Sequence, residues 1–172
     1  MKTIHQLCEP REGIFSSANQ DFALNLKDFL DNGIDAAEFF EENYVSHGMT
    51  RLFELAFSRF AGKDAPAVIK LTQAMGGGKT HNMIALGLLA RDQKFRKSYL
   101  AKLVKSAYEG EVRVVGFHGR ETDYKFGIWG AIAKQLNKFD TLNDYYSPLK
   151  APGETTWTTL LKDEKPLLIL LD

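Results

Sequence analysis

A glycine-rich loop between an apolar segment and a helical pattern constrains the fold more than any other feature of this chain. Residues 67–71 are mostly apolar and have the length of a strand, and residues 73–80 contain three successive glycines. From about residue 79 to residue 91, apolar side chains recur on most sides of a predicted helix. A strand that leads through such a loop into a helix is typical of α/β proteins with a largely parallel sheet.

The rest of the chain continues this alternation. Residues 112–117 and 167–171 predict two further strands, and the second is apolar throughout, as expected for a strand buried on both faces. Helices are predicted over residues 50–61, 94–108, 126–137 and 156–162. Two capping-box pairs, Ser17 with Gln20 and Asp35 with Glu38, mark earlier helix starts. We therefore expect residues 1–63 to form a helical segment that packs on a core formed by residues 64–172.

The loop itself predicts a phosphate-binding site. Glycines accept the positive φ angles that turn successive backbone N–H groups toward a phosphate, and the following helix adds its positive end. Lys79 is expected to reach the β- and γ-phosphates, and the Thr80 hydroxyl to bind Mg²⁺. The usual pattern begins with glycine, whereas this chain has Gln73, whose amide either ends the strand or replaces a contact. The expected nucleotide-binding residues are Gln73, Ala74, Met75, Gly76, Gly77, Gly78, Lys79, Thr80 and His81.

An acidic residue at the end of an apolar strand is expected to complete this site. Asp172 follows the strand 167–171, where P-loop proteins place the carboxylate that holds Mg²⁺ through water. The predicted metal-binding residues are therefore Thr80 and Asp172, with ATP and Mg²⁺ as the cofactors. We expect the catalytic glutamate of such a site to lie beyond Asp172, so that the core stops after this strand and the chain on its own is hydrolysis-deficient.

Several other polar and aromatic residues have two interpretations. His81 either approaches the phosphates or makes a structural contact, and Trp129 is expected in the core rather than as a platform for a base. The loop after the strand 112–117 either faces the γ-phosphate or is an ordinary surface loop. Its polar residues are His118, Arg120, Glu121 and Asp123.

Composition limits the classes of partner. Lys and Arg number 22, Asp and Glu also number 22, and the formal net charge is zero, so no overall basic excess predicts nucleic-acid binding. At helical spacing, the densest basic cluster predicts a solvated helix face. Its members are Arg91, Lys94, Arg96, Lys97, Lys102 and Lys105. The single cysteine, Cys8, predicts neither a disulfide nor a metal cluster, and with no apolar membrane-length run we expect a cytoplasmic protein.

Taken together, these motifs resemble a known family along essentially the whole chain. The most specific pieces are the string Gly-Gly-Gly-Lys-Thr-His at residues 76–81 and the Gly-Ile-Trp-Gly segment at residues 127–130. The chain resembles the large prokaryotic AAA-type ATPases of unknown function whose members include PglY of the BREX phage-defence systems. The resemblance implies a P-loop NTPase core of the AAA/ASCE type, incomplete at its C-terminus and preceded by a helical segment. It also implies ATP binding and hydrolysis by a longer protein, in phage defence or a DNA-linked process.

Two other functional hypotheses stay open at this point. One is a nucleotide-gated scaffold that binds ATP, hydrolyses little or none of it, and holds other defence-system proteins. The other is a fragment of a helicase-type DNA motor, because the string Ala-Met-Gly-Gly-Gly-Lys-Thr also resembles helicase P-loops. The sequence does not decide between ATP and GTP, although no guanine-reading motif is visible.

Overall fold

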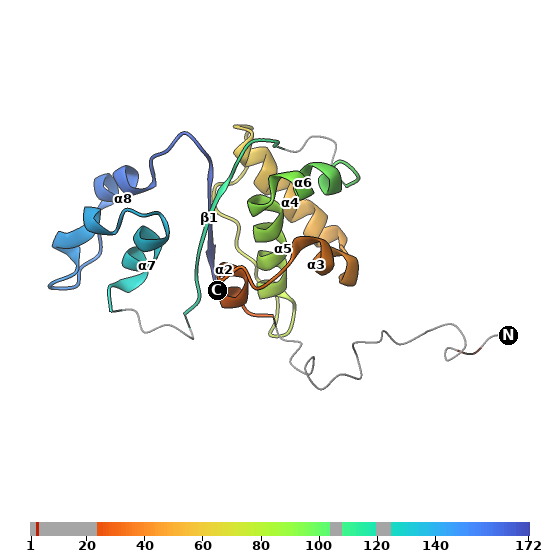
Figure 1. The fold of residues 1–172 in the computed structure, drawn as a ribbon, viewed down its shortest axis with the longest axis horizontal. Coiled ribbons are helices and arrows are strands. Elements are labelled where there is room, and N and C mark those ends of the chain that lie inside the picture. The colour runs from red at the N-terminus through yellow and green to blue at the C-terminus, as the bar shows by residue number, and fades with distance from the viewer. Residues whose placement is uncertain (1–2, 4–23, 104–107, 120–124) are drawn as a thin grey trace.

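The computed structural model describes residues 3, 24–103, 108–119 and 125–172 (Figure 1). Its α-helices are α2 (Leu26–Leu30), α3 (Ala36–Glu42), α4 (His47–Phe60), α5 (Lys79–Arg91), α6 (Gln93–Leu100), α7 (Gly127–Gln135) and α8 (Glu154–Leu161). The remaining elements are the 3-10 helix η3 (Phe139–Tyr145) and the strands β1 (Arg113–Phe117) and β2 (Leu167–Leu171). In this part of the chain, no helix has the length and apolar character needed to cross a membrane.

The two strands form a parallel pair, as the sequence predicts. Arg113 pairs with Leu167, and the register continues to Phe117 and Leu171. The pairing extends one step further, because the Asp172 N–H donates to the Phe117 carbonyl at 3.0 Å. On the other side of β1, the side-chain amide of Gln135 donates to the Gly116 carbonyl at 2.7 Å and accepts from the Gly116 N–H at 3.0 Å. Helix α7 thereby satisfies backbone groups that a further strand would otherwise pair.

Helices cover the sheet on both sides. Figure 1 shows β1 and β2 between the group α2–α6 and the group α7, η3 and α8. The larger apolar core joins the first group to β2 through residues such as Phe29, Leu89 and Leu170. A smaller cluster around Ala133, Leu142 and Leu160 lies in the second group. The larger cluster therefore includes Leu170 of β2, with Val114 of β1 and Leu168 of β2 packed against it, whereas the smaller cluster contains no described residue of either strand.

Side-chain caps set the starts of four helices. The residues before α2, α3, α4 and α6 each accept a hydrogen bond from a first-turn N–H, at 2.8, 2.9, 3.3 and 2.9 Å; they are Asn25, Asp35, Ser46 and Asp92. The predicted start at Asp35 is confirmed, since its carboxylate accepts from the Glu38 N–H. The Ser17–Gln20 pair lies outside the described residues. The helix predicted over residues 94–108 is too long, because α6 ends at Leu100.

The predicted strand over residues 67–71 is not formed. These residues are an extended connection between α4 and α5, with the Val68 side chain 85% exposed and that of Ile69 37% exposed. Apolar composition favours a strand, but a strand also needs a neighbour for its backbone N–H and C=O groups. Among the described residues, β1 and β2 pair with each other and neither pairs with this segment.

One member of the predicted solvated basic face is buried. The Arg96 side chain is fully buried, and its guanidinium donates to the carbonyl oxygens of Leu89 and Ala90 at 2.8 Å and of Tyr108 at 3.1 Å. It also contacts the Gly110 carbonyl. Arg96 therefore satisfies the last carbonyls of α5, which lack partners within the helix. Spacing along a helix cannot distinguish this role from that of a solvated arginine.

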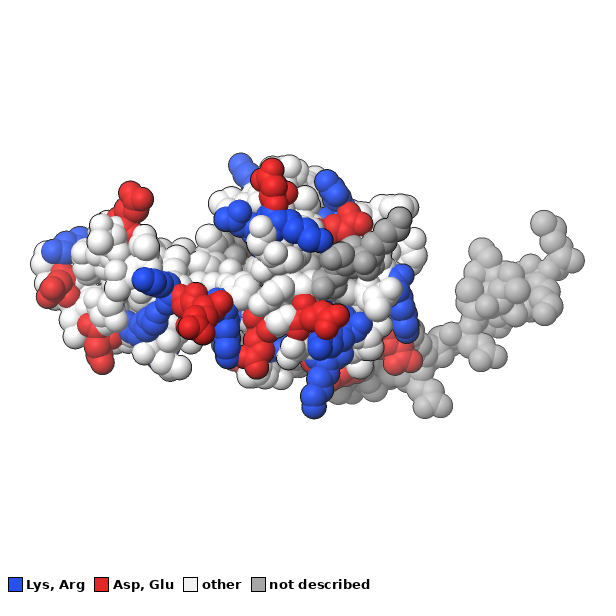
Figure 2. Space-filling model, turned by 90° about the horizontal axis from the view of Figure 1, so that it is seen from above, with Lys and Arg blue, Asp and Glu red and all other residues white. Residues whose placement is uncertain are grey.

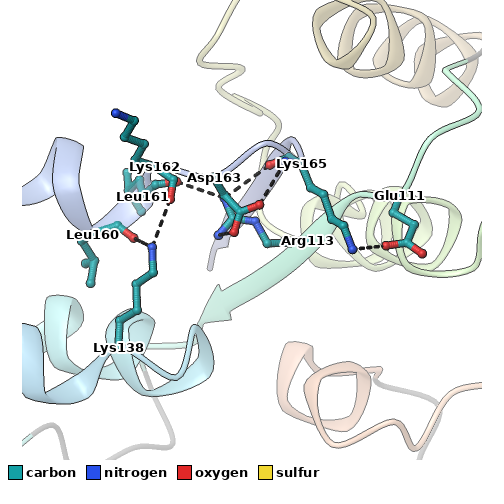
Figure 3. Close-up of polar contacts among 8 residues, drawn as sticks. All are labelled: Glu111, Arg113, Lys138, Leu160, Leu161, Lys162, Asp163 and Lys165. Atoms are coloured by element: carbon teal, nitrogen blue, oxygen red, sulfur yellow. Dashed lines mark hydrogen bonds and ion pairs between the residues drawn. The ribbon is translucent and has the colours of Figure 1, made fainter.

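A polar network joins the starts of the two strands (Figure 3). Arg113 donates to the carbonyl oxygens of Leu161 and Lys165 at 3.0 and 3.3 Å and forms an ion pair with Asp163. Lys165 forms an ion pair with Glu111, which lies two residues before β1. These contacts hold the chain that leaves α8 against the start of β1, so β2 enters the sheet in the parallel direction.

Candidate functional site

The loop 73–80 has a conformation that requires its glycines. Gly76 and Gly78 have φ angles of +77° and +74°, which side chains disfavour. A Cβ atom at Gly77 would lie 2.8 Å from the Gln73 Cβ and 2.9 Å from the Ala74 carbonyl oxygen. The Gly77 N–H donates to that same oxygen at 3.0 Å and closes the turn. The geometry of the loop therefore favours glycine at all three positions.

Lys79 begins helix α5 and folds back over the loop. Its Nζ donates to the carbonyl oxygens of Gln73 and Ala74 at 3.0 and 3.1 Å. Gly78 precedes the helix and provides no side-chain cap, so the first-turn N–H groups have no partner from a capping side chain. The Lys79 ammonium thus lies beside the positive end of helix α5, in a solvent-exposed loop. From there it can exchange the two carbonyls for stronger acceptors.

Thr80, in the first turn of the same helix, reaches a residue far along the chain. Its hydroxyl donates to both carboxylate oxygens of Asp172, at 3.0 Å to Oδ1 and 3.1 Å to Oδ2, across 92 positions of sequence. The structure thus brings together the two predicted metal-binding residues. The hydroxyl oxygen keeps lone pairs, because its hydrogen makes the bond to the carboxylate.

A third side chain, which the sequence places only in a loop of uncertain role, joins this pair. Nδ1 of His118 lies 3.0 Å from Oδ2 of Asp172, and the two side chains are 12% and 19% exposed. His118 follows β1 and Asp172 follows β2, and carboxyl ends of parallel strands are where ligands collect in open α/β sheets. The available signal was that both residues come directly after apolar strands that should run side by side.

His81, the last residue predicted to bind nucleotide, packs against a neighbouring helix. Its ring centroid lies 4.8 Å from that of Phe39 in α3, with the planes inclined by 33°. Burial lowers the pKa of His81 below its ordinary value of 6.5, because desolvation disfavours the charged ring. The contact links α3 to the start of α5, while nucleotide binding by His81 stays a prediction.

The other candidate residues lie in the smaller apolar cluster, at the tip of the loop, or outside the residues that the structure describes. The Trp129 side chain packs against the cluster around Ala133, with its indole N–H buried and unpaired among the described residues. The Met75 side chain is 96% exposed at the tip of the loop. Arg120, Glu121, Asp123 and Cys8 lie outside the described residues.

The oxygen donors of this site fit one kind of metal. In the described part of the chain, no group of three or more His, Cys, Asp and Glu residues is placed to hold a metal. Mg²⁺ needs no such cluster, because it keeps several waters and combines one or two carboxylates with phosphate oxygens. The Thr80 hydroxyl and the Asp172 carboxylate, beside the glycine-rich loop 73–80, are oxygen donors of the kind that this preference requires.

Fold and site together define a parallel α/β arrangement in which a Gly-Lys-Thr loop faces an aspartate at a strand end. Residues 25–113 match the model of the family described as the DUF499 N-terminal domain, which is just over half of the 172 residues. The chain belongs to this DUF499 family. The match spans α2 through the loop to the first residue of β1, so His118 and Asp172 lie outside it. No curated protein and no solved structure matches the chain.

Proposed function

We propose that this chain binds Mg-ATP, with the triphosphate in the loop 73–80 and Mg²⁺ between Thr80 and Asp172. The observation that carries the proposal is the Thr80–Asp172 contact, which joins the loop helix to the end of β2 across 92 positions of sequence. Thr80 and Asp172 come from different elements, α5 and the end of β2, and the sequence predicts both as metal-binding residues of one site. Their contact lies beside the glycine-rich loop and Lys79, which supports a single ligand that binds to the loop, to Lys79 and, through Mg²⁺, to both side chains.

Phosphate binding by the loop is proposed from its positive charge and its hydrogen-bond donors. A triphosphate offers several anionic oxygens, and the loop offers the Lys79 ammonium together with N–H groups at the start of α5. The Lys79 ammonium is charged in either contact, but its hydrogen bonds to anionic phosphate oxygens would gain a charge–charge attraction that its present bonds to neutral carbonyls lack. Lys79 would therefore leave the Gln73 and Ala74 carbonyls and move to the phosphates.

The metal half of the site follows from oxygen chemistry. Mg²⁺, when bound, neutralises phosphate charge and fixes the phosphates relative to the protein. The Thr80 hydroxyl would contact the cation directly, and the Asp172 carboxylate would hold its water ligands. Both side chains already lie within 3.0 Å of each other, so neither has to be brought into place.

The first prediction concerns Lys79 and tests the proposal directly. A fluorescent ATP analogue is titrated into the wild-type chain and into Lys79→Ala, with Mg²⁺ present, and binding is followed by anisotropy. Loss of the charged donor should weaken binding by about 10- to 100-fold, the equivalent of 1.5–3 kcal/mol.

Lys94→Ala is the matched control. Lys94 is an exposed lysine of α6 outside the loop, and its removal changes the net charge equally. Equal binding by wild type and Lys79→Ala would show that the site is misassigned. Equal weakening by both variants would point to non-specific charge attraction rather than to a phosphate site.

Hydrolysis and biological role are part of the proposal on the strength of the resemblance alone. We infer that the longer proteins of this kind hydrolyse ATP in phage defence or a DNA-linked process. A DNA motor receives no support from the surface seen in Figure 2, where acidic and basic side chains are interspersed rather than sorted by sign. Steeply salt-dependent binding of DNA by this chain would favour the motor instead.

A further inference from the structure

An imidazole contacts the carboxylate that the proposed function assigns to Mg²⁺. Nδ1 of His118 lies 3.0 Å from Oδ2 of Asp172. An ionised carboxylate only accepts hydrogen bonds, so Nδ1 carries the hydrogen and donates it. The two side chains are 12% and 19% exposed, so water competes little for this bond.

The backbone around this contact is held as well. The Asp172 N–H donates to the carbonyl of Phe117 at 3.0 Å, and the Gly119 N–H donates to the Asp172 carbonyl at 3.1 Å. His118 therefore lies between two residues that are both hydrogen-bonded to the Asp172 backbone. With its main chain fixed on both sides, Asp172 retains only the rotation of its side chain.

The side-chain bonds restrict that rotation unevenly. Among the described residues, Oδ2 accepts from both His118 and Thr80, whereas Oδ1 accepts from Thr80 alone. The arrangement leaves more acceptor capacity on Oδ1. His118 is the donor that distinguishes the two oxygens, because Thr80 contacts both at nearly equal distance.

We propose that His118 is a positioning residue, which holds the Asp172 carboxylate in the orientation that receives Mg²⁺ together with ATP. This inference rests on the proposed function, since it concerns the same site. Mg²⁺ demands near-octahedral geometry, so a carboxylate free to rotate binds its water shell less well. Hydrogen-bond partners of metal-site carboxylates typically contribute about 10- to 100-fold in metal affinity.

The second prediction is a magnesium titration of His118 variants. Fluorescent ATP at a fixed concentration is mixed with the full chain, and Mg²⁺ is added until the anisotropy or fluorescence change saturates. His118→Ala should raise the half-saturating Mg²⁺ concentration by about 10-fold. His118→Asn should restore most of the loss, because its Nδ2 occupies nearly the position of the imidazole Nδ1. His118→Gln, whose donor lies one bond further out, should not.

Three comparisons decide the outcome. His47→Ala, which removes an exposed histidine at the start of α4, should titrate like wild type. An unchanged half-saturating Mg²⁺ concentration in His118→Ala, or no recovery in His118→Asn, overturns the positioning role. If His118→Ala does not fold by circular dichroism, the contrast between the Asn and Gln variants decides instead, and equal behaviour of those two overturns the role.

Lys79→Ala in the same assay separates the two proposals. If Lys79→Ala binds fluorescent ATP like wild type, the nucleotide site is wrong and the His118 inference falls with it. If Lys79→Ala loses binding while His118→Ala titrates like wild type, the nucleotide site stands and only the positioning role fails.

Discussion

At the scale of single residues, the glycines of the loop show why a motif can be identified without its usual first residue. Gly76 and Gly78 have positive φ angles, and Gly77 lies too close to Gln73 for a side chain. Gln73 itself contributes a backbone carbonyl, which accepts from Lys79, and a Cβ that packs near Gly77. The loop therefore uses the main chain at this position, so a glycine is not needed there for that contact.

The third prediction is that Gly77→Ala weakens ATP binding. The new methyl group would lie 2.9 Å from a backbone oxygen of Ala74, which cannot move without reshaping the loop. Overpacking of this kind costs about 1–3 kcal/mol, so we expect fluorescent ATP to bind roughly 10-fold more weakly. Gly153→Ala is the control, because no atom lies within 4 Å of its added Cβ. Equal affinities for the two variants would contradict the loop geometry.

Arg96 illustrates the opposite case at the same scale. Its residue type and its helical spacing predict a solvated charge, yet its side chain is fully buried against main-chain carbonyls. Burial lowers the pKa of Arg96, but the group remains charged and hydrogen-bonded. Only the folded structure shows that the Arg96 guanidinium reaches the last carbonyls of α5.

At the scale of elements, helices were predicted better than strands. Helix α5 spans the predicted residues 79–91, and the start of α3 follows from its cap, because periodicity and caps are local features. The segment 67–71 is mostly apolar but pairs with neither strand in the described part of the chain, since strand formation depends on a neighbour supplied by distant sequence. The predicted strands β1 and β2 do form, because each pairs with the other.

The fourth prediction concerns the close packing of three elements at Gly87. A Cβ there would lie 2.6 Å from the Phe29 ring of α2 and 3.0 Å from Leu170 of β2. Alanine gains about 1 kcal/mol of helix propensity, but overpacking a core costs about 1–3 kcal/mol. Because Phe29 is fully buried and cannot swing away, we expect Gly87→Ala to lower the free energy of unfolding by about 1 kcal/mol.

Urea denaturation followed by circular dichroism measures this change. Gly48→Ala in α4 is the matched control, since its Cβ would meet only the Ser46 hydroxyl oxygen at 3.8 Å. That variant should be neutral or stabilising. A stabilised Gly87→Ala would mean that α2 and β2 are packed less tightly on α5 than described.

At the scale of the whole molecule, the site lies where the start of α5 meets the ends of the two central strands. Thr80 comes from α5, His118 from the end of β1 and Asp172 from the end of β2. The larger apolar core lies on one side of the sheet and the smaller cluster on the other. A ligand that contacts all three elements would therefore stabilise the folded state as a unit.

The fifth prediction is that ligand binding stabilises the folded state. ATP with Mg²⁺ at about 100 times its dissociation constant should stabilise the chain by about 2.7 kcal/mol and raise its thermal midpoint by roughly 5–10 °C. Thr80→Val should lose the part of the shift that depends on Mg²⁺ while retaining the shift seen with ATP and a chelator. Thermal unfolding with each ligand mixture measures both.

The control for this experiment is Thr159→Val, which removes an exposed hydroxyl that bonds within α8. Its ligand-dependent shifts should equal those of wild type. Identical shifts in Thr80→Val and wild type would remove Thr80 from the metal site.

Local sequence was sufficient for the glycine-rich loop, for the helix that follows it and for the positions of the two apolar strands. These features depend on glycine φ angles, helical periodicity and apolar runs, which act over a few neighbouring residues. The P-loop pattern also predicts that Thr80 and Asp172 share one site, and the two side chains do meet, across 92 positions of sequence. Only the tertiary structure decided that His118 joins them, that Arg96 is buried and that, among the described residues, the segment 67–71 has no strand partner. The physical reason is that contact, burial and strand pairing depend on which distant segments lie side by side, and local propensity carries no information about that choice.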